Sequence, residues 1–287
     1  MKWEAYRNEI DTALDKALPS EDSPPVPIYQ AMRYSLFAGG KRLRPSLVLL
    51  AADSLGGNYR ELLPVAASVE MIHTYSLIHD DLPSMDDDDF RRGKPTNHRV
   101  FGEAIAILAG DALLTAGLEL MCHSSYDAAI RCRLLSMLTR AAGTHGMIGG
   151  QVLDILGESR VLSRVELEMI HAMKTAALIG FCATAPAVVL NLGPEAEQAL
   201  SGYGESIGLA FQIVDDILDV EGTTEELGKT AGKDSHAGKT TYPSLLGLQE
   251  SKQLATDLVQ SACTGIAAYD RNGTLASFAQ FVLSRKQ

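Results

Sequence analysis

Residues 208–220 read GLAFQIVDDILDV, an apolar segment that carries three aspartates. At 3.6 residues per helical turn, Asp215 and Asp219 lie on one face with Asp216 beside them. Segments with the same helical spacing occur along the whole chain, at residues 28–38, 62–80, 102–123, 127–142, 164–190, 195–220 and 240–260. The alternating β-branched runs that are typical of hairpins are essentially missing. The spacing therefore predicts an all-α fold.

The breaks between these segments are short, and no Ser/Gly-rich linker divides the chain, which predicts one domain over residues 1–287. Pro45 is expected to open the helix that follows the Gly39-Gly40 stop. Residues 19–27, PSEDSPPVP, are expected to be an extended connector after a short first helix. Residues 221–239 contain four glycines and three lysines, which favours a mobile surface loop with a function.

Composition excludes several classes of protein. The chain has 25 Lys plus Arg and 36 Asp plus Glu among 287 residues, a net charge of −11, which argues against a nucleic-acid partner. Acidic and basic residues are mixed throughout the N-terminus, which is not the pattern of a signal or transit peptide. The most apolar stretch, 176–192, is too short for a membrane span. These features predict a cytoplasmic protein without a membrane span. The cysteines lack the short spacings of zinc and redox motifs and are expected to be buried: Cys122, Cys132, Cys182 and Cys263.

A second acidic cluster lies in residues 79–93, HDDLPSMDDDDFRRG, with six aspartates within ten residues. A solvated acidic loop is the ordinary interpretation of such a run. An EF-hand is rejected because Phe90 and Arg91 stand where its fifth and sixth loop positions require an oxygen ligand and glycine. Since both clusters adjoin apolar helices, a hard cation is the better explanation, because Mg²⁺ is held by a few carboxylates and phosphate oxygens. The two clusters together predict a socket for a Mg²⁺ and phosphate complex.

Basic and polar residues point to the same chemistry. Residues 40–45, GKRLRP, place three cations beside a predicted helix N-terminus, where an anion is favoured, although a solvated basic turn is the alternative. His73 lies on nearly the same face as Asp80, and a satisfied core histidine is its alternative. Lys174-Thr175 and Gln212 are polar where packing prefers apolar groups. Residues 238–240, GKT, lack the first glycine of a nucleotide-binding loop and follow no strand.

With these motifs in place, the sequence resembles the trans-isoprenyl diphosphate synthase family, which includes the bacterial farnesyl and geranylgeranyl diphosphate synthases. The matching motifs run in the family's order from about residue 28 to 250: GGKRLRP, MIHTYSLIHDDLP, RRGKPTNH, GGQ, MKT, FQIVDDILD and GKTTYPSLLG. The resemblance implies a single large all-α bundle around a deep central cavity. It also implies a homodimer with three Mg²⁺ ions in each active site.

The resemblance further implies a role for each matched residue. Mg²⁺ is coordinated mainly by Asp80, Asp86 and Asp215, supported by Asp81, Asp216 and Asp219. The allylic diphosphate is held by Arg91, Lys174, Lys229 and Lys239. The diphosphate of isopentenyl diphosphate is held by Lys41, Arg44, His73 and Arg92. Thr175 and Gln212 line the developing carbocation.

In the implied reaction the allylic diphosphate, dimethylallyl and then geranyl, ionises in the presence of Mg²⁺. The double bond of isopentenyl diphosphate attacks the cation, and loss of a proton gives a chain five carbons longer. Ionisation separates charge, so Lewis-acid and Lys/Arg stabilisation of the departing diphosphate are what catalysis requires. Closure of the loop at 221–239 is expected to exclude water from the cation.

Product length depends on what ends the tail pocket. Tyr75 lies five residues before Asp80, about 7.5 Å back along the helix, and its ring is large enough to form the floor. Ser76 beside it is too small. In the resembled family an aromatic residue at this position accompanies the fifteen-carbon product, so farnesyl diphosphate is expected, with geranylgeranyl diphosphate as the alternative. A core tyrosine without this role is the other interpretation.

Two remoter alternatives share the fold. A terpene cyclase has a second metal motif that mixes Asn or Asp with Ser and Glu, whereas residues 215–219 read DDILD. A non-catalytic partner subunit is expected to lack metal ligands, and none of the matched positions has lost its ligand.

Overall fold

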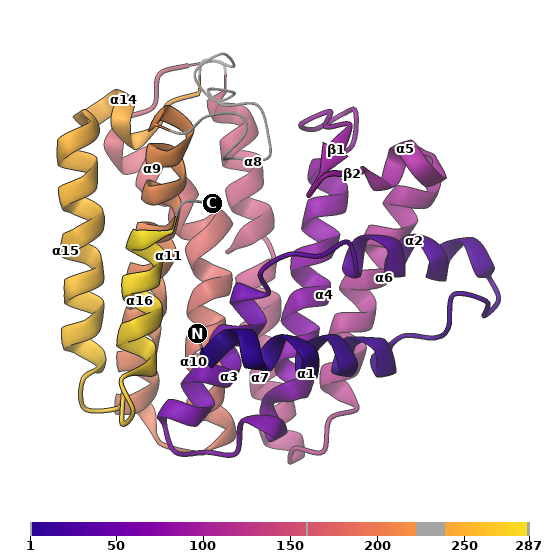
Figure 1. Ribbon diagram of the computed structural model, residues 1–287, viewed down its shortest axis with the longest axis horizontal. Coiled ribbons are helices and arrows are strands. Elements are labelled where there is room, and N and C mark those ends of the chain that lie inside the picture. The colour runs from indigo at the N-terminus through magenta and orange to yellow at the C-terminus, as the bar shows by residue number, and fades with distance from the viewer. Residues whose placement is uncertain (1, 159, 222–238, 286–287) are drawn as a thin grey trace. The chain divides into compact units, whose positions relative to one another are not determined.

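The computed structural model describes residues 2–158, 160–221 and 239–285 (Figure 1). They fall into two compact units, Met1–Leu49 with Asn58–Leu135, and Leu50–Gly57 with Ser136–Gln287. Each unit buries its own set of apolar side chains. The expectation of one domain over the whole chain stays a prediction.

Almost every described element is a helix, which confirms the all-α prediction. The helices of the first unit are α1 (Lys2–Ala17), α2 (Val26–Leu36), η1 (Tyr59–Leu62, a 3₁₀-helix), α4 (Leu63–Asp80), α5 (Asn97–Phe101) and α6 (Glu103–Cys122). Helices α3 (Leu43–Ser54) and α7 (Ala128–Ala142) contribute to both units. The second unit contains α8 (Met147–Gly157), α9 (Arg164–His171), η2 (Ala172–Ala176), α10 (Ala177–Val189), α11 (Pro194–Glu221), α14 (Tyr242–Leu246), α15 (Leu248–Ile266) and α16 (Thr274–Ser284).

Helix α4 is the core helix of the first unit. Pro64 stands in its first turn, where its missing N–H costs nothing. The helix packs along α6 and also contacts α1 and α2 (Figure 1). Gly117 of α6 allows the close approach, because a Cβ there would lie 3.0 Å from the carbonyl oxygen of Ser68. This packing fixes the C-terminal end of α4, where the first acidic motif begins.

A short hairpin follows that motif, although the sequence shows no hairpin pattern. Strands β1 (Phe90–Arg91) and β2 (Lys94–Pro95) pair antiparallel. Arg92 and Gly93 form the turn with φ values of 54° and 74°. Positive φ at both central residues is the geometry of a two-residue type I′ turn, for which Arg-Gly is an unusual pair. The hairpin presents two adjacent arginines beside the acidic motif.

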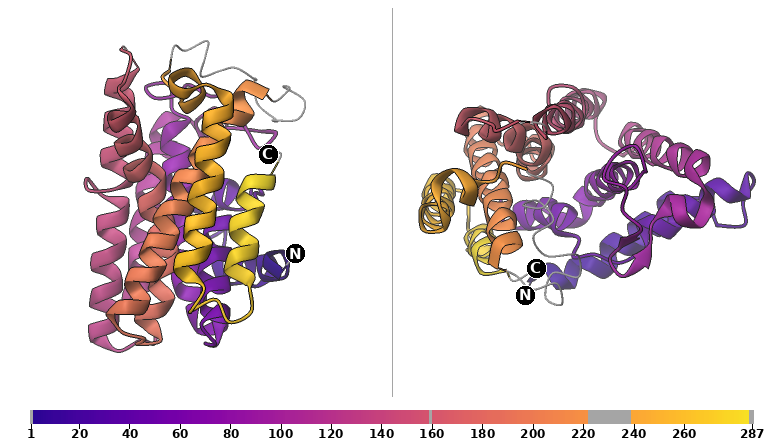
Figure 2. Two further views of the ribbon diagram at one scale, coloured as in Figure 1. Left: turned by 90° about the vertical axis from the view of Figure 1, so that its left-hand side faces the viewer. Right: turned by 90° about the horizontal axis from the view of Figure 1, so that it is seen from above.

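In the second unit α11 packs against α10, α15 and α16, and Figure 2 shows α15 and α16 alongside it. Two glycines let α11 approach its neighbours. A Cβ on Gly204 would lie 2.6 Å from the Cα of Gly180, and one on Gly208 would lie 2.4 Å from the Cα of Ala176. Farther along, Ile213 and Ile217 join a buried cluster with Tyr242. The second acidic motif therefore lies on a helix that is packed tightly along its length.

Several predicted helix limits are wrong. The continuous helix expected at 164–190 is interrupted by the π-helix η2, in which the N–H of Ala177 donates to the carbonyl of Ala172. Such a wide turn inserts one residue and shifts the helical phase, but most of this apolar segment is buried, so the spacing of its apolar residues does not reveal the shift. The segment 240–260 is divided at Gly247, whose φ of 81° ends α14. Helix α3 starts at Leu43, two residues before Pro45.

The expectation that all four cysteines are buried is also wrong. Cys182 is buried and Cys263 is half-buried, but Cys122 and Cys132 are exposed. Cys122 is the last residue of α6, and Cys132 lies on an outward face of α7, where apolar neighbours in the sequence do not guarantee burial.

Two described stretches are long and apolar enough to cross a membrane by composition. One is Arg164–Val189, of which 72% of the apolar window is buried, as expected for core helices of a folded unit. The other is α6, whose window is only 33% buried. Its outward face includes Ile107 and Leu108, which are 43% and 53% exposed.

Candidate active site

The first acidic motif turns back on the end of α4. Asp80 is the last residue of the helix, and Asp81 is its C-cap. The backbone N–H of Asp86 donates to the carbonyl oxygen of Asp80 at 2.9 Å. Asp80 and Asp86 are both half-buried. The turn therefore brings the backbones of the two main ligands predicted in the first unit to the same helix end.

Asp81 and Arg91 form a two-point ion pair. The Nε and Nη2 atoms of Arg91 lie 2.7 Å and 2.6 Å from Oδ1 of Asp81. Burial raises the pKa of Asp81, while the Arg91 guanidinium acts in the opposite direction. Charge-assisted pairs of this kind are strong and geometrically specific. The pair connects strand β1 to the end of α4. It also balances the charge of Asp81, a predicted metal ligand, with that of Arg91, which is predicted to bind the allylic diphosphate.

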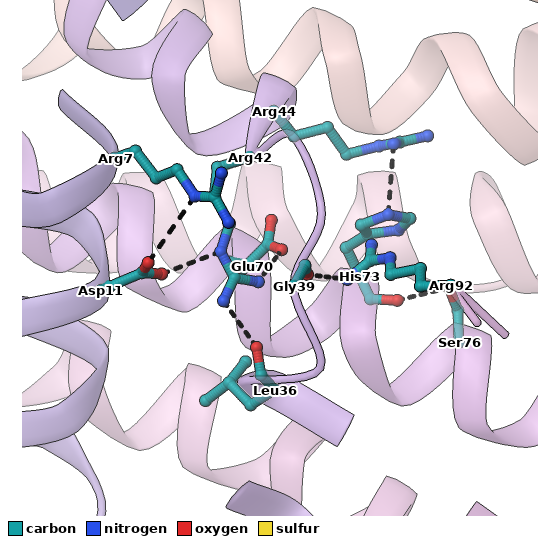
Figure 3. Close-up of polar contacts among 10 residues, drawn as sticks. All are labelled: Arg7, Asp11, Leu36, Gly39, Arg42, Arg44, Glu70, His73, Ser76 and Arg92. Atoms are coloured by element: carbon teal, nitrogen blue, oxygen red, sulfur yellow. Dashed lines mark hydrogen bonds and ion pairs between the residues drawn. The ribbon is translucent and has the colours of Figure 1, made fainter. Parts of the chain in front are cut away.

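A basic cavity of about 130 Å³ lies in the first unit. It is lined by Lys41, Arg42, Leu43, Arg44, Glu70, His73 and Arg92, which include all four residues predicted to bind isopentenyl diphosphate. Nη1 of Arg44 lies 3.4 Å from Nε2 of His73 (Figure 3). Arg92 reaches the same place from the hairpin and donates to the carbonyl oxygen of Gly39. The first unit thus assembles a concentrated positive site from three separate stretches of sequence.

The surroundings of His73 favour the neutral form of its imidazole. Burial lowers the pKa of its imidazole well below the ordinary value, and the surrounding arginines, Arg44 foremost, lower it further. The backbone carbonyl of His73 accepts a hydrogen bond from the hydroxyl of Ser76 at 2.9 Å. The imidazole therefore contributes hydrogen bonding to the cavity without adding a further positive charge.

The second acidic motif lies on α11, in the second unit. Oδ1 of Asp215 accepts from Nη2 of Arg285 at 2.7 Å. The Arg285 guanidinium also stacks on the ring of Phe211, 3.5 Å from its centroid. Asp216 and Asp219 are buried, at 4% and 6% exposure. The three carboxylates thus lie on α11 as predicted, with Asp215 partly exposed and Asp216 and Asp219 buried.

A hydrogen-bonded chain connects this motif to η2. The Thr175 hydroxyl donates to Oε1 of Gln212 at 3.1 Å, and Nε2 of Gln212 donates to Oδ1 of Asp216 at 3.3 Å. The other carboxylate oxygen of Asp216 accepts from the backbone N–H of Tyr242 at 3.0 Å. The structure therefore brings together both residues predicted to line the carbocation and one predicted metal ligand.

Two of the predicted diphosphate lysines share one carboxylate. Nζ of Lys174 lies 2.6 Å from Oδ2 of Asp154, and Nζ of Lys239 lies 3.8 Å from the same oxygen. Lys239 also lies 3.0 Å from Glu158. Burial acts to raise the pKa of Asp154, but the two lysines prevail and hold it below its ordinary value. The lysine pair is therefore held in place by α8 before any diphosphate binds.

Three further predictions concern the loop at 221–239 and the floor of the tail pocket. Lys229 and most of the loop at 221–239 lie outside the described residues. Tyr75 is buried at 5% exposure, with its ring edge-on to His79, and burial together with Asp80 raises its pKa to about 12. Ser76 is half-buried on the next position of α4. The role of Tyr75 as the floor of a tail pocket stays a prediction.

The acidic residues fit a hard cation by their chemistry, although the described residues contain no preformed cluster of three or more His, Cys, Asp or Glu side chains around one point. Oδ1 of Asp219 is buried and has no hydrogen-bond partner within the described part of the chain. A buried carboxylate oxygen without a partner is costly, and a bound cation relieves that cost. Oxygen donors of this type are those that Mg²⁺ prefers.

Sequence reasoning misses three residues of these sites. Arg42 stands out only as part of a basic loop, Asp154 is not among the predicted site residues, and Arg285 carries no signal. Asp154 is a carboxylate in an apolar helix three residues after Gln151 of the GGQ motif, which is a signal of the kind used for the other aspartates. Arg285 meets Asp215 across 70 residues, a contact that no local pattern reveals.

Comparison with known proteins identifies the family of the chain. The Polyprenyl synthetase family matches residues 25–269 of the chain. The chain is 49% identical over 247 residues to a farnesyl diphosphate synthase of Micrococcus luteus, covering 86% of this chain and 84% of that protein. It is 45% identical over 286 residues to a heterodimeric geranylgeranyl pyrophosphate synthase large subunit of Arabidopsis thaliana, covering 96% and 76%.

The crystal structure of an FPP/GFPP synthase from Zymomonas mobilis superimposes with a TM-score of 0.88 at 35% identity, covering 98% of this chain and 97% of that one. The family match spans both acidic motifs and all the residues predicted to bind the two diphosphates. The chain therefore belongs to the polyprenyl synthetase family, the trans-isoprenyl diphosphate synthases.

Proposed function

We propose that the protein condenses isopentenyl diphosphate with dimethylallyl and then geranyl diphosphate to give farnesyl diphosphate. The observation that carries the proposal is the presence of two separate basic sites, one in each unit, each accompanied by an acidic motif. A reaction that joins two diphosphate esters needs two anion sites of different character. A terpene cyclase, which takes one diphosphate, needs no second basic site.

The lysines of the second unit serve the allylic substrate. Lys174 and Lys239 donate to the diphosphate that departs, and Asp154 keeps their ammonium groups close together until the substrate arrives. Thr175 and Gln212 present oxygens to the carbon that becomes positive, and their mutual hydrogen bond fixes both side chains. Positioned dipoles of this kind favour the charge that develops in the transition state.

The cavity of the first unit holds isopentenyl diphosphate. Lys41, Arg44 and Arg92 supply positive charge, and neutral His73 supplies a hydrogen bond. At this site the diphosphate stays attached to its carbon, so binding and orientation are the only tasks required of these residues.

Mg²⁺ is the proposed cofactor, at three ions per active site. The carboxylates that would hold it are Asp80, Asp81, Asp86, Asp215, Asp216 and Asp219. Bound Mg²⁺ supplies Lewis-acid stabilisation of the departing diphosphate. Arg91 and Arg285, which pair with Asp81 and Asp215, balance the carboxylate charge within their own units.

Tyr75 is the proposed floor of the tail pocket, which supports a fifteen-carbon product. Geranylgeranyl diphosphate is the second candidate product, because relatives with that function match nearly the whole chain. The same reaction chemistry serves both products, so only the pocket depth separates them. The loop at 221–239 and Lys229 are proposed to complete the allylic site.

We also propose a cytoplasmic homodimer. The apolar outward face of α6, with Ile107 and Leu108 exposed, supports an interface between copies of this chain. Large exposed apolar patches commonly mark such interfaces. Sedimentation analysis tests this proposal, and a monomer at micromolar concentration in the absence of detergent would contradict it.

The reaction itself is tested by incubating the protein with Mg²⁺, isopentenyl diphosphate and each of dimethylallyl, geranyl and farnesyl diphosphate. Chromatography of the products gives their chain lengths. The proposal expects farnesyl diphosphate from the first two allylic substrates and little conversion of the third. Efficient conversion of farnesyl diphosphate favours the twenty-carbon alternative, and no condensation with any substrate rejects the function.

A further inference from the structure

Arg42 belongs to the same basic loop as Lys41 and Arg44, but its side chain points away from Arg44 and toward the interior of the first unit (Figure 3). Only 2% of the side chain is exposed. Nη1 lies 2.6 Å from Oε1 of Glu70, and Nη2 lies 2.6 Å from the carbonyl oxygen of Leu36. Arg42 therefore plays a different part from its two cationic neighbours.

The third partner of Arg42 comes from the N-terminal helix. Nε of Arg42 lies 2.9 Å from Oδ1 of Asp11, on α1. Arg42 thus connects α1, the end of α2 and the middle of α4 through one guanidinium. A buried guanidinium is costly unless its charge and its donors are matched, and here two carboxylates and one carbonyl match them.

This anchor lies in a stretch of unusual backbone. Arg42 itself has a φ of 53°, which is uncommon for a residue with a side chain, and it follows Gly39 and Gly40 at 98° and 116°. A strained conformation persists only where surrounding contacts fix it. The contacts of the Arg42 side chain supply that fixation, and Lys41 and Arg44 lie one and two residues from it.

Glu70 couples the anchor to the cavity. It lines the cavity that holds His73, which is three residues later on α4. Its negative charge acts to raise the pKa of Arg92, which burial and the nearby arginines lower. The Glu70 carboxylate therefore compensates two arginines, and its position depends on the contact with Arg42.

We infer that Arg42, held by Asp11, is a positioning residue for the isopentenyl diphosphate site. Through Arg42, helix α1 sets the placement of Lys41 and Arg44, although Asp11 does not line the cavity. The inference rests on the proposed function of that cavity. It predicts that a substitution of Asp11 on α1 weakens the binding of isopentenyl diphosphate and leaves the binding of the allylic substrate unchanged.

The test compares Asp11→Asn with Asp15→Asn. Asp15 lies one turn farther along α1 and pairs with Arg33, so its substitution also removes an ion pair from this helix. Asp11→Asn is expected to raise the dissociation constant of isopentenyl diphosphate about tenfold, the effect of one charge-assisted hydrogen bond, as measured by calorimetric titration. The KM of the allylic substrate is expected to stay constant. Asp15→Asn is expected to leave both quantities unchanged.

A double variant shows whether Asp11 acts through Arg42. Adding Asp11→Asn to Arg42→Met is expected to cause no further loss of affinity, whereas independent effects would multiply. If Arg42→Met does not fold, the comparison of Asp11→Asn with Asp15→Asn carries the test alone. Circular dichroism and the thermal midpoint establish that each variant is folded.

The outcomes separate the positioning role from the proposed function. Unchanged affinity in Asp11→Asn, an equal loss for both substrates, or an equal loss in Asp15→Asn would overturn the positioning role. A wild-type protein that does not bind isopentenyl diphosphate would overturn the proposed function and the positioning role with it. A selective loss in Asp11→Asn that is absent from Asp15→Asn supports the inference.

Discussion

The substitution Gly40→Ala tests whether the position of Arg92 in the basic cavity depends on the glycine backbone beside it. A Cβ at Gly40 would lie 2.5, 2.6 and 2.8 Å from Cζ, Nη1 and Nη2 of Arg92. Ordinary van der Waals contact begins near 3.4 Å, so the guanidinium has to move by about 1 Å. That movement is enough to break its hydrogen bond to the carbonyl of Gly39. Gly40→Ala is therefore expected to displace Arg92 from the cavity.

Gly39→Ala is the matched control. Gly39 has a φ of 98°, comparable with the 116° of Gly40, but a Cβ at Gly39 would have nothing within 4 Å. Each substitution places a side chain on strained backbone and is expected to cost about 1–3 kcal/mol of unfolding free energy. Only Gly40→Ala moves Arg92. Loss of one charged hydrogen bond to a diphosphate costs about 1.5–3 kcal/mol, or roughly 10- to 150-fold in affinity.

The assay measures unfolding in denaturant and the KM of isopentenyl diphosphate for both variants. Similar losses of stability with a KM increase confined to Gly40→Ala are the expected result. Equal KM values in the two variants would refute the assignment of Arg92 to this cavity. If the KM of the allylic substrate increased instead, Arg92 would belong to the site of the allylic diphosphate.

Four further outcomes are expected. Asp215→Asn removes a proposed metal ligand, so turnover should fall by orders of magnitude while helical circular dichroism is preserved; near-normal turnover contradicts the assignment. Arg44→Ala should mainly raise the KM of isopentenyl diphosphate and Lys174→Ala that of the allylic substrate, and equal effects on one substrate would reject the division between the sites. Tyr75→Ala should shift products toward twenty carbons or more in chromatography, and an unchanged distribution places the floor elsewhere. Burial lowers the pKa of His171 to about 4, against an ordinary 6.5, with the Asp154 charge opposing and Lys174 assisting. As pH falls, the imidazole is protonated in the unfolded chain before it is protonated in the folded one. His171 should therefore lower the free energy of unfolding by about 2 kcal/mol between pH 7 and pH 5. If the free energy of unfolding of a His171→Gln variant decreased equally over this range, this prediction would be contradicted.

The sequence alone determined the helical class and the positions of both acidic motifs. Helical periodicity is a local property, and aspartates such as Asp215 and Asp219 stand out because they interrupt an apolar pattern. The same reasoning selected the basic residues of the cavity, since charges such as Arg44 adjoin a predicted helix start. Residue type and spacing are sufficient wherever the chemistry is carried by neighbours along the chain.

Only the tertiary structure decided which of these charges pair with one another. Arg42 and Arg44 are two residues apart and alike in sequence, yet one is buried between Asp11 and Glu70 while the other faces His73. The wide turn of η2 and the turn of the hairpin likewise depend on backbone geometry that apolar spacing does not encode. Contacts between distant segments are selected by packing and by the cost of burying an unmatched charge, and both terms exist only once the helices have come together.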